Sequence, residues 1–276
     1  MSNEQLPTYF LSHGGGPWPY VEDPTRKNYL NLERFLVELR PELRSPLRAV
    51  LIISGHWEER GFAISAAAKP GMVFDYFGFP EYLYRIRYAA PGSPEVAGRV
   101  CDLLAAGGMP ARLDRERGFD HGTFSLMKVL APEENVPIVQ LSLDVGMDPA
   151  LHLHVGRLLA PLRQEGVLIL GSGFSYHNFA IRDARATSIS GHFDAWLQHV
   201  LVQSEPAERS EQLIRWEEAP SARLAHPREE HLIPLMVAVG AAEDEPGACI
   251  YHETAFLQLV TASSFRFGKP RADAPV

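Results

Sequence analysis

Three of the 11 histidines in this chain stand directly after short apolar runs and close to glycines. His13 follows the run TYFLS, His56 follows AVLIIS after one glycine, and His177 follows VLIL through a turn that contains glycine and serine. Glycine at such places permits tight turns and a close approach of the backbone to a ligand. Imidazole is the commonest metal-ligating side chain, and histidines without cysteine suit Fe(II) or Zn(II). The pattern favours a metal site at which these imidazoles converge.

Two further histidines are candidates for the same site. His231 lies in HPREEHLIPL, within the first turns of a helix expected to begin near Pro227, so it can point toward the same place. His121 lies in the turn-like segment GFDHG, where Asp120 is available as an orienting carboxylate. The other six histidines have no supporting pattern and are expected at the surface: His152, His154, His192, His199, His226 and His252.

Other catalytic chemistries find no support in the motifs. The segment GSGFS at residues 171–175 puts serine in the wrong place for a nucleophile elbow. The glycines at residues 14–16 lack the Lys-Ser/Thr of a phosphate-binding loop, and no GxGxxG fingerprint follows a predicted strand. The two cysteines, Cys101 and Cys249, are too few for a disulfide framework or a cysteine-rich zinc site.

The elements that must position these histidines are indicated by apolar runs that alternate with helical periodicity. Several of the runs are apolar on both faces, which is typical of central strands in a covered sheet. The predicted strands are Thr8–Ser12, Ala49–Ser54, Phe62–Ser65, Ile138–Leu143 and Val167–Leu170. The predicted helices are Asn28–Leu43, one from Ser93 to Gly107, one from Asp148 to Gly166, one through Phe193–Leu201, and one from Pro227 to about Ala242.

This alternation predicts an α/β fold: one domain with a mostly parallel central sheet flanked by helices. Ligands of such sheets bind beyond the carboxyl ends of the strands. His13, His56 and His177 follow strands directly, so the metal site is expected at the C-terminal edge of the sheet. The stretch from Phe74 to Tyr88 carries seven aromatic residues in 15 positions, which fits either core packing or the wall of a pocket for a flat ring.

Length and composition indicate an ordinary globular protein. The chain has 276 residues, of which 46% are hydrophobic and 22% charged. We expect one catalytic domain over residues 1–268 and a C-terminal tail over residues 269–276. A net charge of −8 argues against a nucleic-acid partner. The apolar run Leu232–Ala242 is too short to span a bilayer, and no signal peptide is visible, so a cytoplasmic protein without a membrane partner is expected.

Several of these segments together resemble the class III extradiol ring-cleavage dioxygenases, the superfamily of the protocatechuate 4,5-dioxygenase catalytic subunit. The likeness is strongest to the DOPA 4,5-dioxygenase-like branch. The matching segments occur in order and cover most of the chain: LSHG at 11–14, ISGHW at 53–57, FDYFGFP at 74–80, YAAPGSP at 88–94, GFDHG at 118–122, VQLS at 139–142, GSG at 171–173 with His177-Asn178, and Glu230-His231 with Leu235.

The resemblance implies a non-haem metal-dependent extradiol dioxygenase that opens the ring of a DOPA-like or other small catechol with O2. It implies that His13, His56 and His231 bind the metal. His177 is implied as a fourth ligand in zinc-filled forms or as an acid/base, and His121 as a second acid/base. Fe(II) is expected for activity, and Zn(II) can occupy the site.

Alternatives remain open at this point. Fe(II) oxygenases typically use two histidines and one carboxylate, so Glu229 or Glu230 competes with His231 as third ligand. A zinc-dependent hydrolase or a non-catalytic metal-binding protein could use the same residues. The catechol, the bond that is cleaved, the native metal and the assembly into a homo-oligomer are not determined by the sequence.

Overall fold

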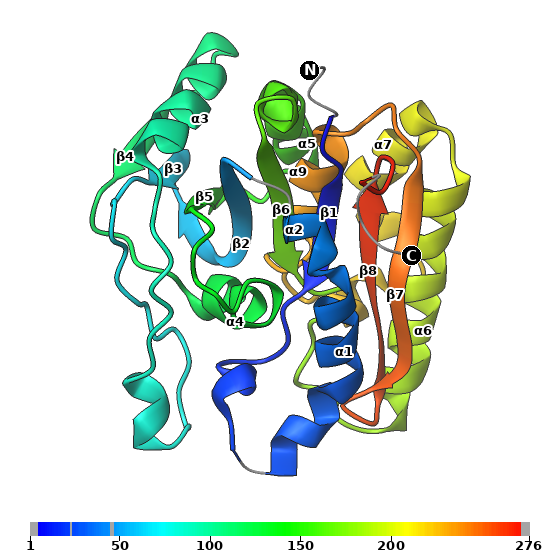
Figure 1. Ribbon diagram of the computed structural model, residues 1–276. Coiled ribbons are helices and arrows are strands. Elements are labelled where there is room, and N and C mark those ends of the chain that lie inside the picture. Colours follow the sequence, from blue (N-terminus) through cyan, green and yellow to red (C-terminus); the bar gives the residue numbers. More distant parts are fainter. Residues whose placement is uncertain (1–4, 23, 45–46, 272–276) are drawn as a thin grey trace.

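The centre of the fold is an eight-stranded sheet whose four middle strands run parallel (Figure 1). The computed structural model describes residues 5–22, 24–44 and 47–271. The strands are β1 (Thr8–Ser12), β2 (Ala49–Glu59), β3 (Phe62–Ser65), β4 (Ala111–Asp114), β5 (Ile138–Asp144), β6 (Val167–Gly173), β7 (Gly247–Phe256) and β8 (Val260–Phe267). Their order is β4-β3-β5-β2-β6-β1-β8-β7. The predicted α/β fold with a mostly parallel sheet is confirmed.

All five predicted strands are present, and three others were missed. The four parallel neighbours β5, β2, β6 and β1 are buried along most of their length, which explains their mostly apolar sequences. The missed strands lie nearer the edges: β8 pairs antiparallel with β1 and β7, and β4 pairs with β3. Edge strands are half-exposed, so β4 and β7 carry mixed polar and apolar residues that no simple run reveals.

Strand β2 is longer than predicted, and His56 lies within it. Its pairing with β5 is regular up to Ile53 and resumes at Glu58, with a register shift between them. His56 therefore occupies an irregular section of the strand, where one edge is released from regular pairing with β5. Such bulges bend a strand and re-aim its side chains.

Helices cover both faces of the sheet (Figure 1). They are α1 (Leu30–Leu39), α2 (Pro41–Arg44), α3 (Pro94–Ala106), α4 (His121–Leu130), α5 (Pro149–Leu159), α6 (Ala184–Gln198), α7 (Pro206–Ile214), α8 (Ala222–Ala225) and α9 (Ile233–Gly240). In the view of Figure 1, α1 and α4 lie in front of the middle strands, while α5 and α9 lie behind them. The histidines predicted for the metal site lie where the parallel strands end, opposite the side of the sheet on which these strands begin.

Two helix predictions need correction. The segment GFDHG was expected to be a turn, yet α4 begins at His121, with Asp120 as its N-cap accepting from the Thr123 amide. The last helix was expected from Pro227, but α9 begins at Ile233, so His231 precedes the helix. Helix α4 is buried almost all round, so it lacks the amphipathic stripe that marks a helix in sequence.

Two glycines of β6 allow residues 231–234, which include the start of α9, to pass over the strand in direct contact. A Cβ added at Gly173 would lie 2.1 Å from the His231 carbonyl oxygen, and one at Gly171 would lie 2.4 Å from the Pro234 carbonyl oxygen. The amide of Phe174 also donates to the His231 carbonyl at 3.0 Å. These contacts set the position of the His231 backbone over the carboxyl end of β6.

The predicted limits of the domain and tail stay predictions. Residues 272–276 of the predicted tail lie outside the described residues, and Arg271 Nη1 donates to the Glu42 carbonyl at 2.7 Å. Within residues 5–22, 24–44 and 47–271, no helix combines the length and the apolar character needed to cross a membrane.

Candidate metal centre

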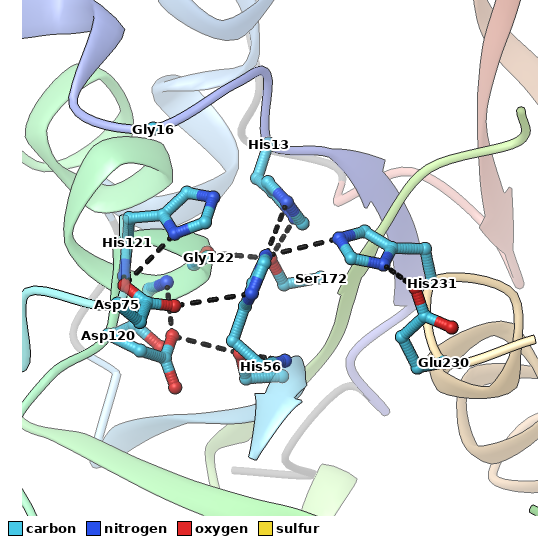
Figure 2. A network of polar contacts seen from close by, with 12 residues as sticks. His13, Gly16, His56, Asp75, Asp120, His121, Gly122, Ser172, Glu230 and His231 are labelled. Atoms are coloured by element: carbon cyan, nitrogen blue, oxygen red, sulfur yellow. Dashed lines mark hydrogen bonds and ion pairs between the residues drawn. The ribbon is translucent and has the colours of Figure 1, made fainter. Parts of the chain in front are cut away.

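Three imidazoles converge at the carboxyl end of the parallel strands (Figure 2). His13 follows β1, His56 comes from the irregular part of β2, and His231 stands just before α9. The Nε2 atom of His56 lies 3.2 Å from Nε2 of His13 and 3.1 Å from Nε2 of His231. His13 and His231 are buried, and His56 is partly buried. The prediction that histidines after separate strands meet at this edge therefore holds for His13 and His56, and His231 joins them from the segment before α9.

The outer nitrogen of each ring faces an acceptor, which sets the tautomer. Ser172 Oγ donates to the Gly122 carbonyl at 2.6 Å, so it accepts from His13 Nδ1 at 3.0 Å. The two other Nδ1 atoms face carboxylates, which only accept when ionised. His56 Nδ1 lies 3.2 Å from Asp75 Oδ2, and His231 Nδ1 lies 2.9 Å from Glu230 Oε1. Each neutral ring carries its proton on Nδ1 and turns an Nε2 lone pair toward the centre.

Lone pairs this close repel one another unless a cation lies between them. Zn–N bonds of about 2.0–2.1 Å would separate two ligand nitrogens by about 2.9 Å at a right angle and about 3.4 Å in a tetrahedron. The observed separations of 3.1 and 3.2 Å fall between these values. The donor set therefore fits a divalent first-row metal ion, and outer acceptors that orient the ligand rings are typical of such sites.

Burial keeps these three rings neutral. It lowers the pKa of His13 and of His231 well below the ordinary value, and the charges of neighbouring imidazoles lower both further. Burial likewise lowers the pKa of His56 to about 3, with His121 adding to the shift and Asp75 opposing it. Loss of hydration disfavours the charged imidazolium. A metal ligand must be deprotonated, so all three rings are ready to bind near neutral pH.

His121 and His177 flank the triad, each beside one member of it. The ring centroids of His121 and His56 are 3.9 Å apart, and those of His177 and His231 are 3.4 Å apart with nearly parallel planes. His121 Nδ1 contacts Asp75 Oδ1 at 3.0 Å. All five candidate histidines of the sequence analysis are thus brought together.

The same outer acceptor pattern holds for His177, whose Nδ1 contacts Glu230 Oε1 at 2.9 Å. Burial alone would raise the pKa of Asp75 and of Glu230, but the facing imidazoles hold both pKa values below the ordinary ones. Both carboxylates therefore stay ionised and serve as acceptors. The sequence analysis missed Asp75, because it stands in an aromatic stretch far from any histidine in the chain, and it considered Glu230 only as a competing metal ligand.

Asp120 does not orient His121, contrary to expectation. It is fully buried, and burial raises its pKa, with the charge of Asp75 adding to the shift. Its carboxylate caps α4 and is held by three side chains: Ser54 Oγ at 2.8 Å, Gln140 Nε2 at 2.7 Å and Arg117 Nη2 at 3.1 Å. Asp120 thus anchors the start of the helix that carries His121, and Asp75 contacts the ring.

The competing third ligands also find other partners. Glu230 lies behind His231 and faces two Nδ1 atoms, while Glu229 pairs with Arg223 at 2.5 Å. Among the six histidines expected at the surface, His192, His199 and His252 are exposed and His154 is partly buried. His152 and His226 are fully buried, so their placement was wrong.

A cavity of about 650 Å³ opens onto the five histidines. The aromatic stretch from Phe74 to Tyr88 serves both as a pocket wall and as core. Tyr76, Phe77 and Phe79 line the cavity, whereas Tyr88 is buried in the core. Other walls come from residues that the sequence analysis did not assign to a pocket. These include Tyr29, Phe174, Tyr176, Phe179, Arg182 and Phe256. The cavity has the size and the apolar lining of a small-molecule site.

The geometry of the site agrees with the known proteins to which this chain is similar. A family model described as the catalytic LigB subunit of aromatic ring-opening dioxygenase matches residues 7–268. A relative from Beta vulgaris, named 4,5-DOPA dioxygenase extradiol, is 35% identical over 268 residues, which cover 94% of this chain and 96% of that protein.

Further relatives extend the likeness to bacteria. A protein of Escherichia coli K12 with the same name is 34% identical over 247 residues, covering 87% of each chain. The crystal structure of an uncharacterized protein from Escherichia coli K12 superposes with a TM-score of 0.71 at 29% identity, covering 95% of this chain and 100% of that one.

Proposed function

Because this chain belongs to the family of the catalytic LigB subunit of aromatic ring-opening dioxygenases and is an extradiol dioxygenase, we propose that it opens the ring of a DOPA-like or other small catechol with Fe(II) held by His13, His56 and His231. The observation that carries the metal assignment is the convergence of three Nε2 lone pairs whose rings are protonated at Nδ1. We propose residues 1–268 as the catalytic unit, which the family match over residues 7–268 supports.

The metal supplies the redox chemistry and the template for the diol and O2. The three proposed ligands are neutral, so a bound Fe(II) ion would keep its formal charge of +2, which suits a catechol bound as an anion. The rings are oriented in advance by Ser172, Asp75 and Glu230, so binding needs no rearrangement of the protein. His177 is the fourth ligand we propose for a zinc-filled form.

His121 and His177 are the groups we propose for proton transfer. Their Nδ1 atoms lie 3.0 and 2.9 Å from carboxylate oxygens of Asp75 and Glu230, and a proton on Nδ1 would leave Nε2 of each ring as a base. Such a base can accept a proton from a catechol hydroxyl and return one to the opened product. Both rings line the cavity, so a substrate there would meet them.

The aromatic walls are proposed to hold the flat ring and exclude water. Tyr76 makes edge contacts with Phe79 and with His121, at ring centroid separations of 5.3 and 6.1 Å. The aromatic wall thus contacts His121, one of the two groups proposed for proton transfer. The family membership argues against the two alternatives, a zinc hydrolase and a non-catalytic metal-binding protein.

The test is O2 consumption by apoprotein that has been reloaded with Fe(II) under anaerobic conditions. A panel of small catechols that includes DOPA is added, and O2 uptake is measured together with absorbance. Stoichiometric uptake with a new yellow chromophore would support ring opening and rank the substrates. Protein loaded with Zn(II) is the control and should consume no O2. The proposal would be refuted if the Fe(II)-loaded protein consumed no O2 with any catechol of the panel.

A further inference from the structure

The cavity has a polar end formed by the loop between β6 and α6. Arg182 and Tyr176 of this loop both line the cavity. Arg182 is the only lysine or arginine among the described residues that line it, and Asp75, the only carboxylate there, is taken up by His56 and His121. The whole chain carries a net charge of −8, so a cation at this place stands against the general charge.

Arg182 has no carboxylate partner among the residues that the structure describes, although one stands next to it in the chain. Asp183 is bound by Arg185, whose Nε and Nη2 atoms lie 3.0 and 2.8 Å from its oxygens. Arg182 Nε donates to the Phe179 carbonyl at 2.7 Å, which ties the side chain to its own loop. Neither terminal nitrogen of Arg182 has a hydrogen-bond or ion-pair partner within the part of the chain that the structure describes. Two parallel donors are therefore free to face a ligand.

Tyr176 provides a second, independent observation. Its side chain is 95% buried, because the residue is only 5% exposed, and its hydroxyl has no hydrogen-bond partner in the described structure. Burial raises the pKa of Tyr176, and the charge of Asp183 raises it further, so the hydroxyl stays a donor. An unpaired buried hydroxyl is costly unless a ligand satisfies it.

We propose that Arg182 and Tyr176 bind an anionic substituent of the substrate, so that the chain selects catechols that carry a carboxylate over neutral or cationic ones. This inference rests on the proposed function for the ring-opening step. A guanidinium presents two parallel N–H donors that match the two oxygens of a carboxylate. The diol would face the five histidines, and the substituent would face the loop of residues 174–183.

Two ligands that differ only in charge test this proposal. They are 3-(3,4-dihydroxyphenyl)propionate and its methyl ester. Each is titrated by calorimetry into Zn(II)-loaded protein, which binds without turnover, and each is assayed for O2 uptake with Fe(II)-loaded protein. The variants are Arg182→Gln and Tyr176→Phe. Arg215→Gln, at the exposed end of α7, is the matched control for loss of one positive charge.

We expect Arg182→Gln to weaken binding of the carboxylate and raise its KM by roughly 10-fold or more, with kcat and all values for the ester little changed. Tyr176→Phe should act in the same direction by roughly 3- to 10-fold. Arg182→Lys should restore part of the preference. Equal effects on both ligands, or none, would overturn the inference.

The two proposals fail in different ways. If the unmodified protein binds the carboxylate through Arg182 in the calorimeter but opens neither ring, the anion site stands and the proposed substrate class for ring opening fails. If the protein opens the rings of both ligands and Arg182→Gln changes neither rate, the proposed function stands and the anion site fails.

Discussion

Asp75 and Glu230 lie on opposite sides of the metal-site histidines, and each contacts the Nδ1 atoms of two of them. Asp75 contacts His56 and His121, and Glu230 contacts His231 and His177. Each carboxylate thus joins one converging imidazole to one flanking imidazole. A single charge therefore orients a proposed ligand and a proposed proton-transfer group together. Figure 2 shows Asp75 and Glu230 on either side of His56.

Replacement of a proposed ligand should remove the metal. We expect His13→Ala and His56→Ala to lower the bound metal from about one equivalent to nearly none, because two imidazoles hold a divalent ion weakly. Metal content after gel filtration is the measurement. His192→Ala, on the exposed side of α6, is the matched control. Unchanged metal content in His13→Ala would refute the site assignment.

Replacement of His177 should separate binding from turnover. His177→Ala removes a group that we assign to proton transfer, so kcat should fall by roughly 100- to 10,000-fold. The Fe(II) content should stay near that of the unmodified protein, because three ligands remain. O2 uptake and metal analysis on the same sample distinguish the two effects. Loss of the metal together with the activity would instead make His177 a ligand.

Loss of the Asp75 charge should disturb both imidazoles that it contacts. In Asp75→Asn the amide N–H₂ or the carbonyl must face an Nδ1 atom, so one ring of His56 and His121 loses its acceptor. We expect metal affinity to fall by roughly 10- to 100-fold, measured by competition with a chelator. Asp102→Asn on the exposed face of α3 is the control and should change nothing. Equal affinities of Asp75→Asn and the unmodified protein would show that Asp75 does not orient His56.

A methyl group at Gly173 should displace His231. The added Cβ would lie 2.1 Å from the His231 carbonyl oxygen, so the chain before α9 must move. We expect Gly173→Ala to lose roughly 1–3 kcal/mol of stability and most of its metal affinity. The control is Gly98→Ala in α3, where a Cβ meets nothing within 4 Å. That change should stabilise the protein by roughly 0.5–1 kcal/mol, because alanine is the better helix former. Denaturation and metal titration of both variants provide the measurement.

Acid should begin to destabilise the metal-free protein at pH values well above those at which ordinary carboxylates titrate. The pKa values of His13, His56 and His231 are lowered in the folded state, to about 3 for His56, whereas unfolded histidine titrates near 6.5. The unfolded chain therefore binds more protons as the pH falls below about 6.5, and stability is lost from there toward pH 3. Each such ring contributes up to about 1.4 kcal/mol per pH unit. Denaturant unfolding at pH 7.5 to 4.5 measures the slope.

A buried histidine outside the metal site offers a clean control for that slope. Burial lowers the pKa of His226 to about 3, and its Nε2 donates to the Ser175 carbonyl at 3.1 Å. Glutamine can keep that donor without titrating, so His226→Gln should flatten the slope by one residue's share. A stability that stays constant between pH 7.5 and 5 would contradict the lowered pKa values.

The sequence by itself determined the parallel core and the position of the histidines that follow its strands. Strands β1, β2, β5 and β6 are buried on both faces, so their apolar runs are visible without any knowledge of neighbours. The carboxyl ends of parallel strands lie at one edge, so His13 and His56 had to meet there. Glycines beside them indicated close approach, and Gly173 shows its cause in the chain before α9.

Only the tertiary structure decided which groups stand behind the histidines. Asp75 and Glu230 lie 19 positions beyond His56 and 53 beyond His177 in the chain, so no local pattern links either carboxylate to both of its imidazoles. The same holds for Arg182, an exposed arginine that the fold places at the wall of the cavity with no carboxylate partner among the described residues. Local periodicity reports which side of an element is buried. Contacts between charged side chains depend on distances between elements, and those exist only after the sheet and its helices have packed.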